Sequence, residues 1–394
     1  MIKISSLINI LKKNNSNFFT GVPNSVLKEL SFFLQNKKKK THIIATNEGS
    51  AVSIGIGHYL STKKIPCVYM QNSGLSNALN PLISIAHHKV YSIPLILIIG
   101  WRGSPRLKDE PQHNVKGKIT EKILKLLNIK YTIIRSNKDL KKFDKQIKIS
   151  KKNKSIVACL IENGTLEKSK KIIKKKDYFN LDKELFFKTL LENIKSNTKI
   201  ISSTGFNSRE LMYIRQKYNY KKSKDFYMVG GMGHTSSVAF GYSLQSKKKI
   251  ICIDGDGSFL MHLGAIKTLG TFAEKNLKYI LLNNNIHDSV GGQSTYTKNI
   301  DLKNFSKSLG FRKFFVIKNK KNLKINLNNF INSRNLSFLE VRVSNNKIKI
   351  KSNENIKKYI NDKSLKKIFL IKKKKSFITS GAEKFFKKDI DNKE

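Results

Sequence analysis

Two short polar motifs stand at the ends of apolar runs and have the residue types of a metal site. Gly255-Asp256-Gly257 follows the apolar run 250–253, and Asn283-Asn284 follows the apolar run 279–282, with Asn284 28 positions after Asp256. A helix-length segment separates the two runs, so they predict one βαβ unit that brings a carboxylate and a carboxamide to the same edge of a sheet. Oxygen ligands of this kind suit a hard divalent cation, and the flanking glycines let a phosphate approach the following helix. The pattern therefore indicates a cation that holds a diphosphate.

The elements that must position these motifs are strands alternating with helices. This alternation runs from about residue 41 to 103 and returns between Asp182 and Ser344, which predicts an α/β chain with two domains. Each domain is expected to be a mostly parallel sheet covered by helices on both faces, with no middle domain. We predict a first domain over 1–167, a Lys-rich linker over 168–181, a second domain over 182–344 and a basic C-terminal tail over 345–394.

The remaining composition favours a cytoplasmic protein. The first 19 residues mix Lys and Asn with apolar residues, which is typical of an amphipathic helix and not of a secretion signal. The longest apolar stretch, 93–101, is too short to span a bilayer and contains Pro94. The three cysteines lie far apart in or beside apolar runs, so we expect buried free thiols in a reducing compartment.

The net charge of +50 could indicate a nucleic-acid or anionic membrane partner. However, only 8 of the 77 basic residues are Arg, and the Lys residues are scattered through Asn- and Ile-rich sequence. Nucleic-acid readers rely on Arg for bidentate contacts, whereas biased codon usage in an AT-rich genome produces this Lys excess on solvated faces. We predict no specific nucleic-acid partner and no membrane partner, with weak adhesion to polyanions at low salt as a by-product.

Two further segments have residues suited to a cofactor. Glu48, in the segment 46–49, opens a predicted helix after a strand, where it is either catalytic or a first-turn acid favoured by the helix dipole. The segment 229–234 has three glycines interrupted by Met232, so it is either a turn or a loop that exposes its backbone to a ligand.

Together, these segments and the metal motif resemble the pattern of thiamine-diphosphate enzymes. The resemblance implies that Glu48 hydrogen-bonds the aminopyrimidine ring and thereby promotes formation of the thiazolium ylid. It also implies that Mg²⁺ is bound by Asp256, Asn284 and the carbonyl of Ile286. The cofactor itself would contact the carbonyl of Gly230, the side chain of Met232, the loop at Gly233, and the backbone amides of Gly257 and Ser258.

Further segments resemble the phosphonopyruvate decarboxylase family closely and sulfopyruvate decarboxylase less so: 21–25, 69–81, 100–103 with 108–113, and 287–293. The resemblance extends over roughly residues 15–345. It implies thiamine-diphosphate-dependent decarboxylation of 3-phosphonopyruvate to phosphonoacetaldehyde and CO₂, in phosphonate biosynthesis of the 2-aminoethylphosphonate type. It also implies a homo-oligomer, at least a dimer, because the cofactor in this family lies between the first domain of one subunit and the second domain of another.

A substrate with a carboxylate and a phosphonate needs cationic or amide donors on the loops at strand ends. The candidate substrate-binding residues are Asn24, Asn72, Arg102, Lys108, His287 and Gln293. Asn24 stands where family members often have Asp, so this position departs from the family pattern. His113 is a candidate proton donor, or alternatively a structural loop residue. Sulfopyruvate decarboxylation is the first alternative function, and a non-catalytic polyanion-binding protein on a thiamine fold is the second.

Overall fold

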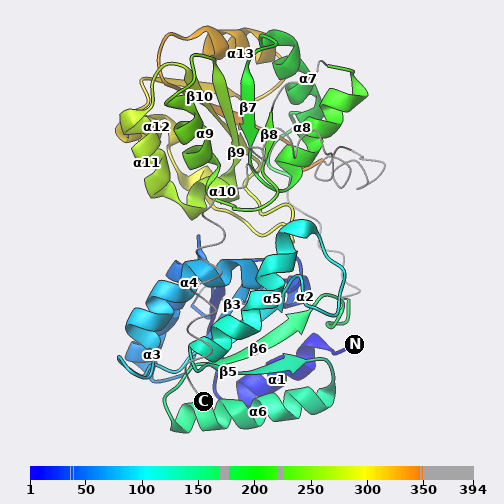
Figure 1. The fold of residues 1–394 in the computed structure, drawn as a ribbon, viewed down its shortest axis with the longest axis vertical. Coiled ribbons are helices and arrows are strands. Elements are labelled where there is room, and N and C mark those ends of the chain that lie inside the picture. The colour runs from blue at the N-terminus through cyan, green and yellow to red at the C-terminus, as the bar shows by residue number, and fades with distance from the viewer. Residues whose placement is uncertain (36, 39, 169–176, 221–224, 347, 349–394) are drawn as a thin grey trace, which may run out of the picture. The chain divides into compact units, whose positions relative to one another are not determined.

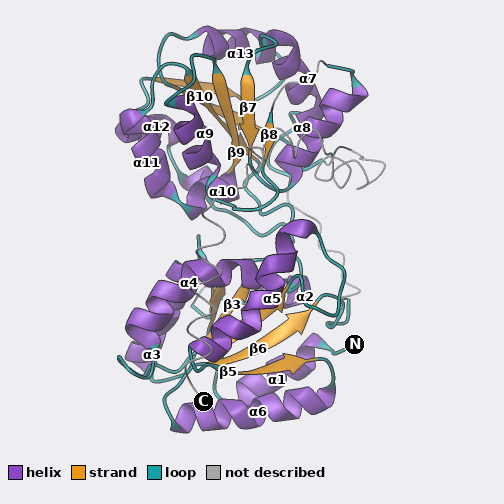
Figure 2. Cartoon of the chain, viewed as in Figure 1, coloured by secondary structure: helices purple, strands orange, loops and turns teal. Residues whose placement is uncertain are grey.

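The structure is a computed structural model that describes residues 1–348, apart from positions 36, 39, 169–176, 221–224 and 347. Its strands form two six-stranded sheets, and all strand pairs in both sheets are parallel (Figures 1 and 2). The predicted fold class is therefore confirmed. Much of the predicted linker and nearly all of the predicted basic tail lie outside the described residues, and the predicted domain boundaries stay predictions.

The first sheet has the strand order β2-β1-β3-β4-β6-β5. Its strands are β1 (Phe19–Gly21), β2 (His42–Ile44), β3 (Cys67–Gln71), β4 (Ile96–Trp101), β5 (Lys130–Ile134) and β6 (Val157–Glu162). Its helices are α1 (Ile4–Lys13), α2 (Lys28–Gln35), α3 (Glu48–Thr62), α4 (Leu75–Pro81), α5 (Pro111–Leu126) and α6 (Asn137–Lys152), with the short turns η1 (Asn72–Gly74) and η2 (Leu82–Ala86) around α4.

Alternate residues of the first sheet supply two separate cores, one on each face. Ile96 and Ile98 of β4 pack with α1, α2 and α6, whereas Leu97 and Ile99 pack with α3, α4 and α5. Because successive side chains of a strand point to opposite faces, a strand buried on both faces reads as a continuous apolar run. The run 96–99 is such a strand.

The second sheet repeats this design with the strand order β11-β12-β10-β9-β7-β8. Its strands are β7 (Lys199–Ser202), β8 (Phe226–Tyr227), β9 (Ile250–Gly255), β10 (Leu277–Asn283), β11 (Lys313–Ile317) and β12 (Ser337–Arg342). Its helices are α7 (Lys183–Asn193), α8 (Phe206–Lys217), α9 (Thr235–Ser243), α10 (Asp256–Met261), α11 (Leu263–Phe272), α12 (Leu302–Leu309) and α13 (Leu323–Asn332), together with the 3₁₀ turn η3 (Thr297–Asn299). One face packs on α7, α8 and α13, and the other on α9 to α12.

Each sheet reverses its strand order at one point, which fixes where loops from different strands meet. In the first sheet the chain runs from β1 outward to β2 and returns to β3 on the other side of β1. In the second sheet it runs from β7 to β8 and returns to β9 on the other side of β7. Ligands of such sheets bind at the carboxyl ends of the strands beside the reversal. The predicted metal motif follows β9 and β10, and Glu48 follows β2.

Two smaller predictions also hold. The N-terminal segment forms the amphipathic helix α1, which buries Leu7, Ile8 and Leu11. Cys67, Cys159 and Cys252 are free and buried, and burial raises the pKa of each thiol. No helix in the described part of the chain is both long and apolar enough to cross a lipid bilayer.

Candidate active site

Asp256 is the first residue of α10 and is only 4% exposed. Its carboxylate accepts hydrogen bonds from neutral groups: the backbone amide of Gly257 at 3.0 Å and the hydroxyl of Thr295 at 2.7 Å. Burial raises the pKa of Asp256 to about 7, although these hydrogen bonds favour the ionised form. No described Lys, Arg or His forms an ion pair with it. A buried carboxylate held only by neutral donors is suited to bind a cation.

The loop after β10 brings the second half of the metal motif to Asp256. The backbone amide of Asn285 donates to Oδ1 of Asn283 at 3.2 Å and lies close enough to Asp256 to lower the pKa of that carboxylate. Asn285 has a φ of 60°, a left-handed conformation that Asn tolerates better than most residues. The side chain of Asn283 is buried and donates to Glu340 at 2.8 Å, so it is directed into the sheet. Oδ1 of the half-buried Asn284 accepts from the amide of Ile286 at 3.2 Å, and the buried carboxamide of Asn285 has no hydrogen-bond partner among the described residues.

The glycine-rich segment 229–234 packs against the start of α10. Gly231 and Gly233 have φ angles of 68° and 87°, which side chains rarely adopt. The amide of Gly233 donates to the Ser258 hydroxyl at 3.0 Å. A Cβ added to Gly257 would lie 3.2 Å from the Met232 methyl group and 2.8 Å from Nδ1 of His287. The backbone at Gly257 is therefore closely flanked by Met232 and by the metal-motif loop.

Glu48 is the first residue of α3 and is 5% exposed. Asn47 caps this helix by accepting from the Ser50 amide at 2.8 Å. Nδ2 of Asn77, in α4, donates to Oε2 of Glu48 at 2.9 Å. A Cβ added to Gly74 would lie only 2.0 Å from Oε1 of Glu48. The carboxylate is thus held by an amide on one oxygen and faces a glycine backbone with the other.

Asn72 and Arg102 are mainly occupied by contacts within their own loops. The Asn72 carboxamide donates to the Arg102 carbonyl and to the Thr120 hydroxyl, both at 2.9 Å, and accepts from the Arg102 amide at 3.1 Å. The Arg102 guanidinium forms a bidentate pair with Asp109 at 2.7 and 2.5 Å. Burial alone would raise the pKa of Asp109, but the hydrogen bonds and charge of Arg102, with the amides of Glu110 and Gly103, lower it to about 2. Both predicted substrate-binding residues therefore stabilise the loop between β4 and α5.

Close packing also accounts for the Trp and Gly residues of the segment 100–103. The Trp101 indole is 2% exposed and donates to the Gly117 carbonyl at 3.0 Å. A Cβ added to Gly103 would lie 2.0 Å from the His113 carbonyl oxygen. These contacts hold α5 against the end of β4, so this segment has a structural reason for its Trp and Gly residues.

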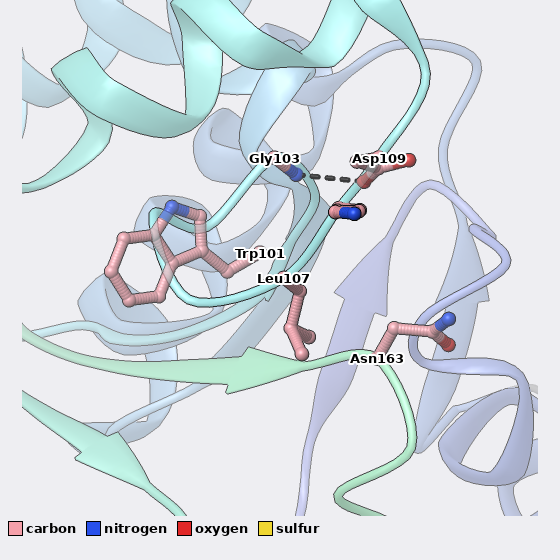
Figure 3. A pocket seen from close by; sticks show the side chains of 6 residues that line it. Trp101, Gly103, Leu107, Asp109 and Asn163 are labelled. Atoms are coloured by element: carbon pink, nitrogen blue, oxygen red, sulfur yellow. Dashed lines mark hydrogen bonds between the residues drawn. The ribbon is translucent and has the colours of Figure 1, made fainter.

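A pocket of about 180 Å³ opens at the carboxyl ends of β4 and β6 (Figure 3). The amide of Gly103 donates to Asp109 beside it at 2.7 Å. The pocket is lined by Trp101, Gly103, Leu107, Lys108, Asp109 and Asn163. Lys108 is exposed at this pocket. Among the predicted substrate-binding residues, Lys108 is the one that lines it.

Two other predicted substrate residues have unused polar atoms. Gln293 is 3% exposed, and neither atom of its amide has a hydrogen-bond partner among the described residues. Asn24 accepts from the Leu27 amide at 3.0 Å through Oδ1, whereas its buried Nδ2 has no described partner. Buried polar groups are usually paired, so both side chains are suited to a ligand.

The two predicted histidines both lie in surroundings that disfavour the imidazolium. Burial lowers the pKa of His287 to about 4, so this imidazole is neutral near pH 7. Burial, followed by the charge of Arg102, also lowers the pKa of His113. Nε2 of His113 lies 3.9 Å from the Glu110 carboxylate. As a neutral imidazole, either residue offers one donor and one acceptor nitrogen.

Comparison with known proteins adds the family to this geometry. The model of the N-terminal TPP binding domain of thiamine pyrophosphate enzymes matches residues 4–123, and that of their C-terminal TPP binding domain matches residues 204–341. Phosphonopyruvate decarboxylase of Streptomyces viridochromogenes is 31% identical over 309 residues, which cover 74% of this chain and 76% of that protein. The chain belongs to the phosphonopyruvate decarboxylase family. It is a thiamine-diphosphate-dependent decarboxylase.

Two further relatives are also similar to most of this chain. Phosphonopyruvate decarboxylase of Streptomyces hygroscopicus is 29% identical and covers 79% of this chain and 80% of its own length. Sulfopyruvate decarboxylase of Methanosarcina acetivorans is 27% identical and covers 85% of this chain and 89% of its own length. The phosphonopyruvate decarboxylases and the sulfopyruvate decarboxylase are thus similar to this chain over most of their lengths.

Three residues beside the candidate site escaped the sequence analysis. They are Asn77, which holds Glu48; Thr295, which holds Asp256; and Asp254, which is buried and accepts from the Tyr279 hydroxyl at 3.0 Å. Burial raises the pKa of Asp254 to about 6. Asp254 had a visible signal, since an acid at the end of an apolar strand is unusual. Asn77 and Thr295 had none, because their partners lie 29 and 39 positions away.

Proposed function

We propose that this protein decarboxylates 3-phosphonopyruvate to phosphonoacetaldehyde and CO₂, with thiamine diphosphate and Mg²⁺. The observation that supports this substrate assignment is the 31% identity to a phosphonopyruvate decarboxylase over about three quarters of both chains. In this reaction the bond between the carboxylate and the keto carbon breaks, its electron pair stays on the keto carbon, and that carbon takes up a proton. When bound, thiamine diphosphate supplies the electron sink that makes this bond cleavage possible.

The residues around Asp256 fit a diphosphate held through Mg²⁺. Asp256 and Asn284 would supply side-chain oxygens and Ile286 a carbonyl, while the other positions of an octahedral site belong to phosphate and water oxygens. The amides of Gly257 and Ser258 would bind the diphosphate. The segment with Gly230, Met232 and Gly233 would hold the aminopyrimidine and thiazolium rings. The support is the buried Asp256 carboxylate without a described cationic partner and the tight backbone at Gly257.

Glu48 would bind the ring nitrogen of the aminopyrimidine and hold a proton there. Support comes from its burial and from the Asn77 amide, which occupies Oε2. Because Oε2 is engaged by Asn77, Oε1, which packs against the backbone of Gly74, is the oxygen that would bind the cofactor.

The substrate anions would be recognised mainly by neutral amides. Gln293 and Asn24 have buried donors without described partners, and Lys108 adds a cation at the edge of the pocket. Asn72 and Arg102 would act by shaping the loop that they already stabilise. As neutral imidazoles, His113 and His287 would orient the substrate through one hydrogen-bond donor and one acceptor nitrogen each.

Sulfopyruvate is the alternative substrate, because a sulfonate uses the same donors as a phosphonate and the Methanosarcina acetivorans relative is a sulfopyruvate decarboxylase. Steady-state kinetics with phosphonopyruvate, sulfopyruvate and pyruvate would distinguish them. We expect the highest kcat/KM for phosphonopyruvate. An equal or higher kcat/KM for sulfopyruvate would replace the substrate assignment.

Cofactor binding separates catalysis from a polyanion-binding role. Calorimetry should detect Mg²⁺-dependent binding of thiamine diphosphate to the wild type and none to Asp256→Ala. An absence of binding to the wild type, together with salt-sensitive affinity for nucleic acid, would favour the polyanion-binding alternative.

We further propose that the protein is a cytoplasmic homo-oligomer, at least a dimer, in a phosphonate-forming pathway, with the domain boundaries predicted above. Light scattering of the purified protein tests the oligomeric state. A monomer that is fully active at the concentration of the assay would contradict an active site shared between subunits.

A further inference from the structure

Thr295 connects the loop after β10 to the carboxylate of Asp256. It is 6% exposed, and its hydroxyl donates to Oδ2 of Asp256 at 2.7 Å. The same hydroxyl lies 2.9 Å from the hydroxyl of the fully buried Thr297. A hydroxyl has one hydrogen, and an ionised carboxylate can only accept. When Asp256 is ionised, as a metal ligand must be, Thr297 is the donor to Thr295, and the two hydroxyls form a directed chain that ends on Asp256.

Thr295 also holds the other half of the metal motif. Its backbone amide donates to the Asn285 carbonyl at 3.0 Å, beside Asn284. The loop between them is closed by the antiparallel bridge between Ile286 and Ser294. One residue thus contacts Asp256 through its side chain and the Asn284–Ile286 segment through its backbone.

The arrangement leaves space for a cation on the carboxylate. An ionised carboxylate has about four lone-pair sites. Two donors to the Asp256 carboxylate are described: the Gly257 amide on Oδ1 and the Thr295 hydroxyl on Oδ2. One donor on each oxygen fixes the plane of the carboxylate, and about two lone pairs remain for a metal ion.

We propose that Thr295 is a positioning residue of the Mg²⁺ site, which orients Asp256 and tethers the Asn284–Ile286 segment to it. This inference rests on the proposed Mg²⁺ and thiamine-diphosphate function. Mg²⁺ demands near-ideal geometry at short distances, so a carboxylate that is free to rotate binds it less tightly. The hydroxyl contributes orientation and no ligand oxygen.

The test is the affinity for Mg²⁺ at a fixed, saturating concentration of thiamine diphosphate, measured by calorimetry. Thr295→Val removes the hydroxyl at nearly constant shape and should weaken Mg²⁺ binding by about 10- to 100-fold. Thr295→Ser restores the hydroxyl and should stay within about threefold of the wild type. If Thr295→Val does not fold, Thr295→Ala takes its place and should weaken Mg²⁺ binding by the same factor.

Thr132→Val is the matched control. Thr132 is also a buried threonine whose hydroxyl donates to a side-chain oxygen, that of Gln146 at 2.5 Å, but it belongs to β5 of the first sheet. It should lose stability without losing Mg²⁺ affinity. If Thr295→Val lowers the unfolding temperature and leaves Mg²⁺ affinity unchanged, Thr295 is merely structural and the inference is wrong. If the wild type itself binds no Mg²⁺ with thiamine diphosphate, the proposed function fails as well.

Discussion

The contact between Gly74 and Glu48 provides a direct test of how the fold orients the carboxylate that we propose to be catalytic. An added Cβ at Gly74 would lie 2.0 Å from Oε1 of Glu48 and 2.2 Å from its carboxyl carbon. Gly74 has φ −84° and ψ −8°, which alanine adopts without strain. Gly74→Ala therefore changes the space beside Glu48 and leaves the backbone conformation allowed.

The expected size of the effect follows from that distance. An ordinary contact is about 3.5 Å, so the carboxylate must move by roughly 1.5 Å. Because it is the end of a flexible side chain, Glu48 can turn away at a cost of about 1–3 kcal/mol in stability. A catalytic group displaced by about 1 Å loses roughly 100-fold in rate. Gly74→Ala should thus lower kcat by about 100-fold and remain folded.

The assay combines kcat, the unfolding temperature and the affinity for thiamine diphosphate with Mg²⁺. Gly57→Ala is the matched control, because Gly57 is exposed in the same helix as Glu48 and an added Cβ would meet nothing within 4 Å. This control should keep full activity and gain up to about 1 kcal/mol of stability. A Gly74→Ala enzyme with kcat within threefold of the wild type would refute the proposal that this close approach sets the position of Glu48.

Two further predictions concern stability. The half-buried His42 hydrogen-bonds the Tyr69 hydroxyl at 2.9 Å, and burial lowers its pKa from 6.5 to about 4. As the pH falls, the unfolded chain binds a proton on His42 before the folded protein does, so the contribution of His42 to stability is complete above pH 6.5 and decreases as the pH drops toward 4. In urea unfolding, His42→Gln should reduce the loss of unfolding free energy between pH 7.5 and 5 by about 2 kcal/mol. An unchanged loss would show that His42 is not its cause. Lys183 pairs with the fully buried Glu210 at 3.1 Å, so Lys183→Met should cost about 3–5 kcal/mol of unfolding free energy. Lys148→Met, which removes the more exposed pair with Asp144, should cost less than about 1 kcal/mol. Equal costs would exclude burial as the reason for the difference.

The fold class was predictable because it depends on local patterns. A run such as 96–99 is apolar at every position, which indicates a strand buried on both faces, and helices of suitable length follow each run. The places of Glu48, Asp256 and Asn284 were predictable for the same reason, since each follows a strand at its carboxyl end.

The roles of the loop residues were less accessible from the sequence. The segments with Asn72 and Arg102 resemble those of phosphonopyruvate decarboxylases, which suggested substrate donors. In the fold their polar atoms bind one another, Thr120 and Asp109. Whether a polar side chain faces a ligand or its own loop depends on backbone angles and packing that no spacing specifies.

The sequence alone determined the two-domain α/β architecture, the cofactor motif and the strand ends on which its residues lie. Only the tertiary structure decided the strand orders, the amide on Glu48 and the hydroxyl chain from Thr297 through Thr295 to Asp256. The physical reason is how far apart in the chain the interacting residues lie. Apolar periodicity is set by neighbours a few residues apart, whereas a hydrogen bond across 39 positions requires the loop after β10 to turn back at Asn285 and close on itself.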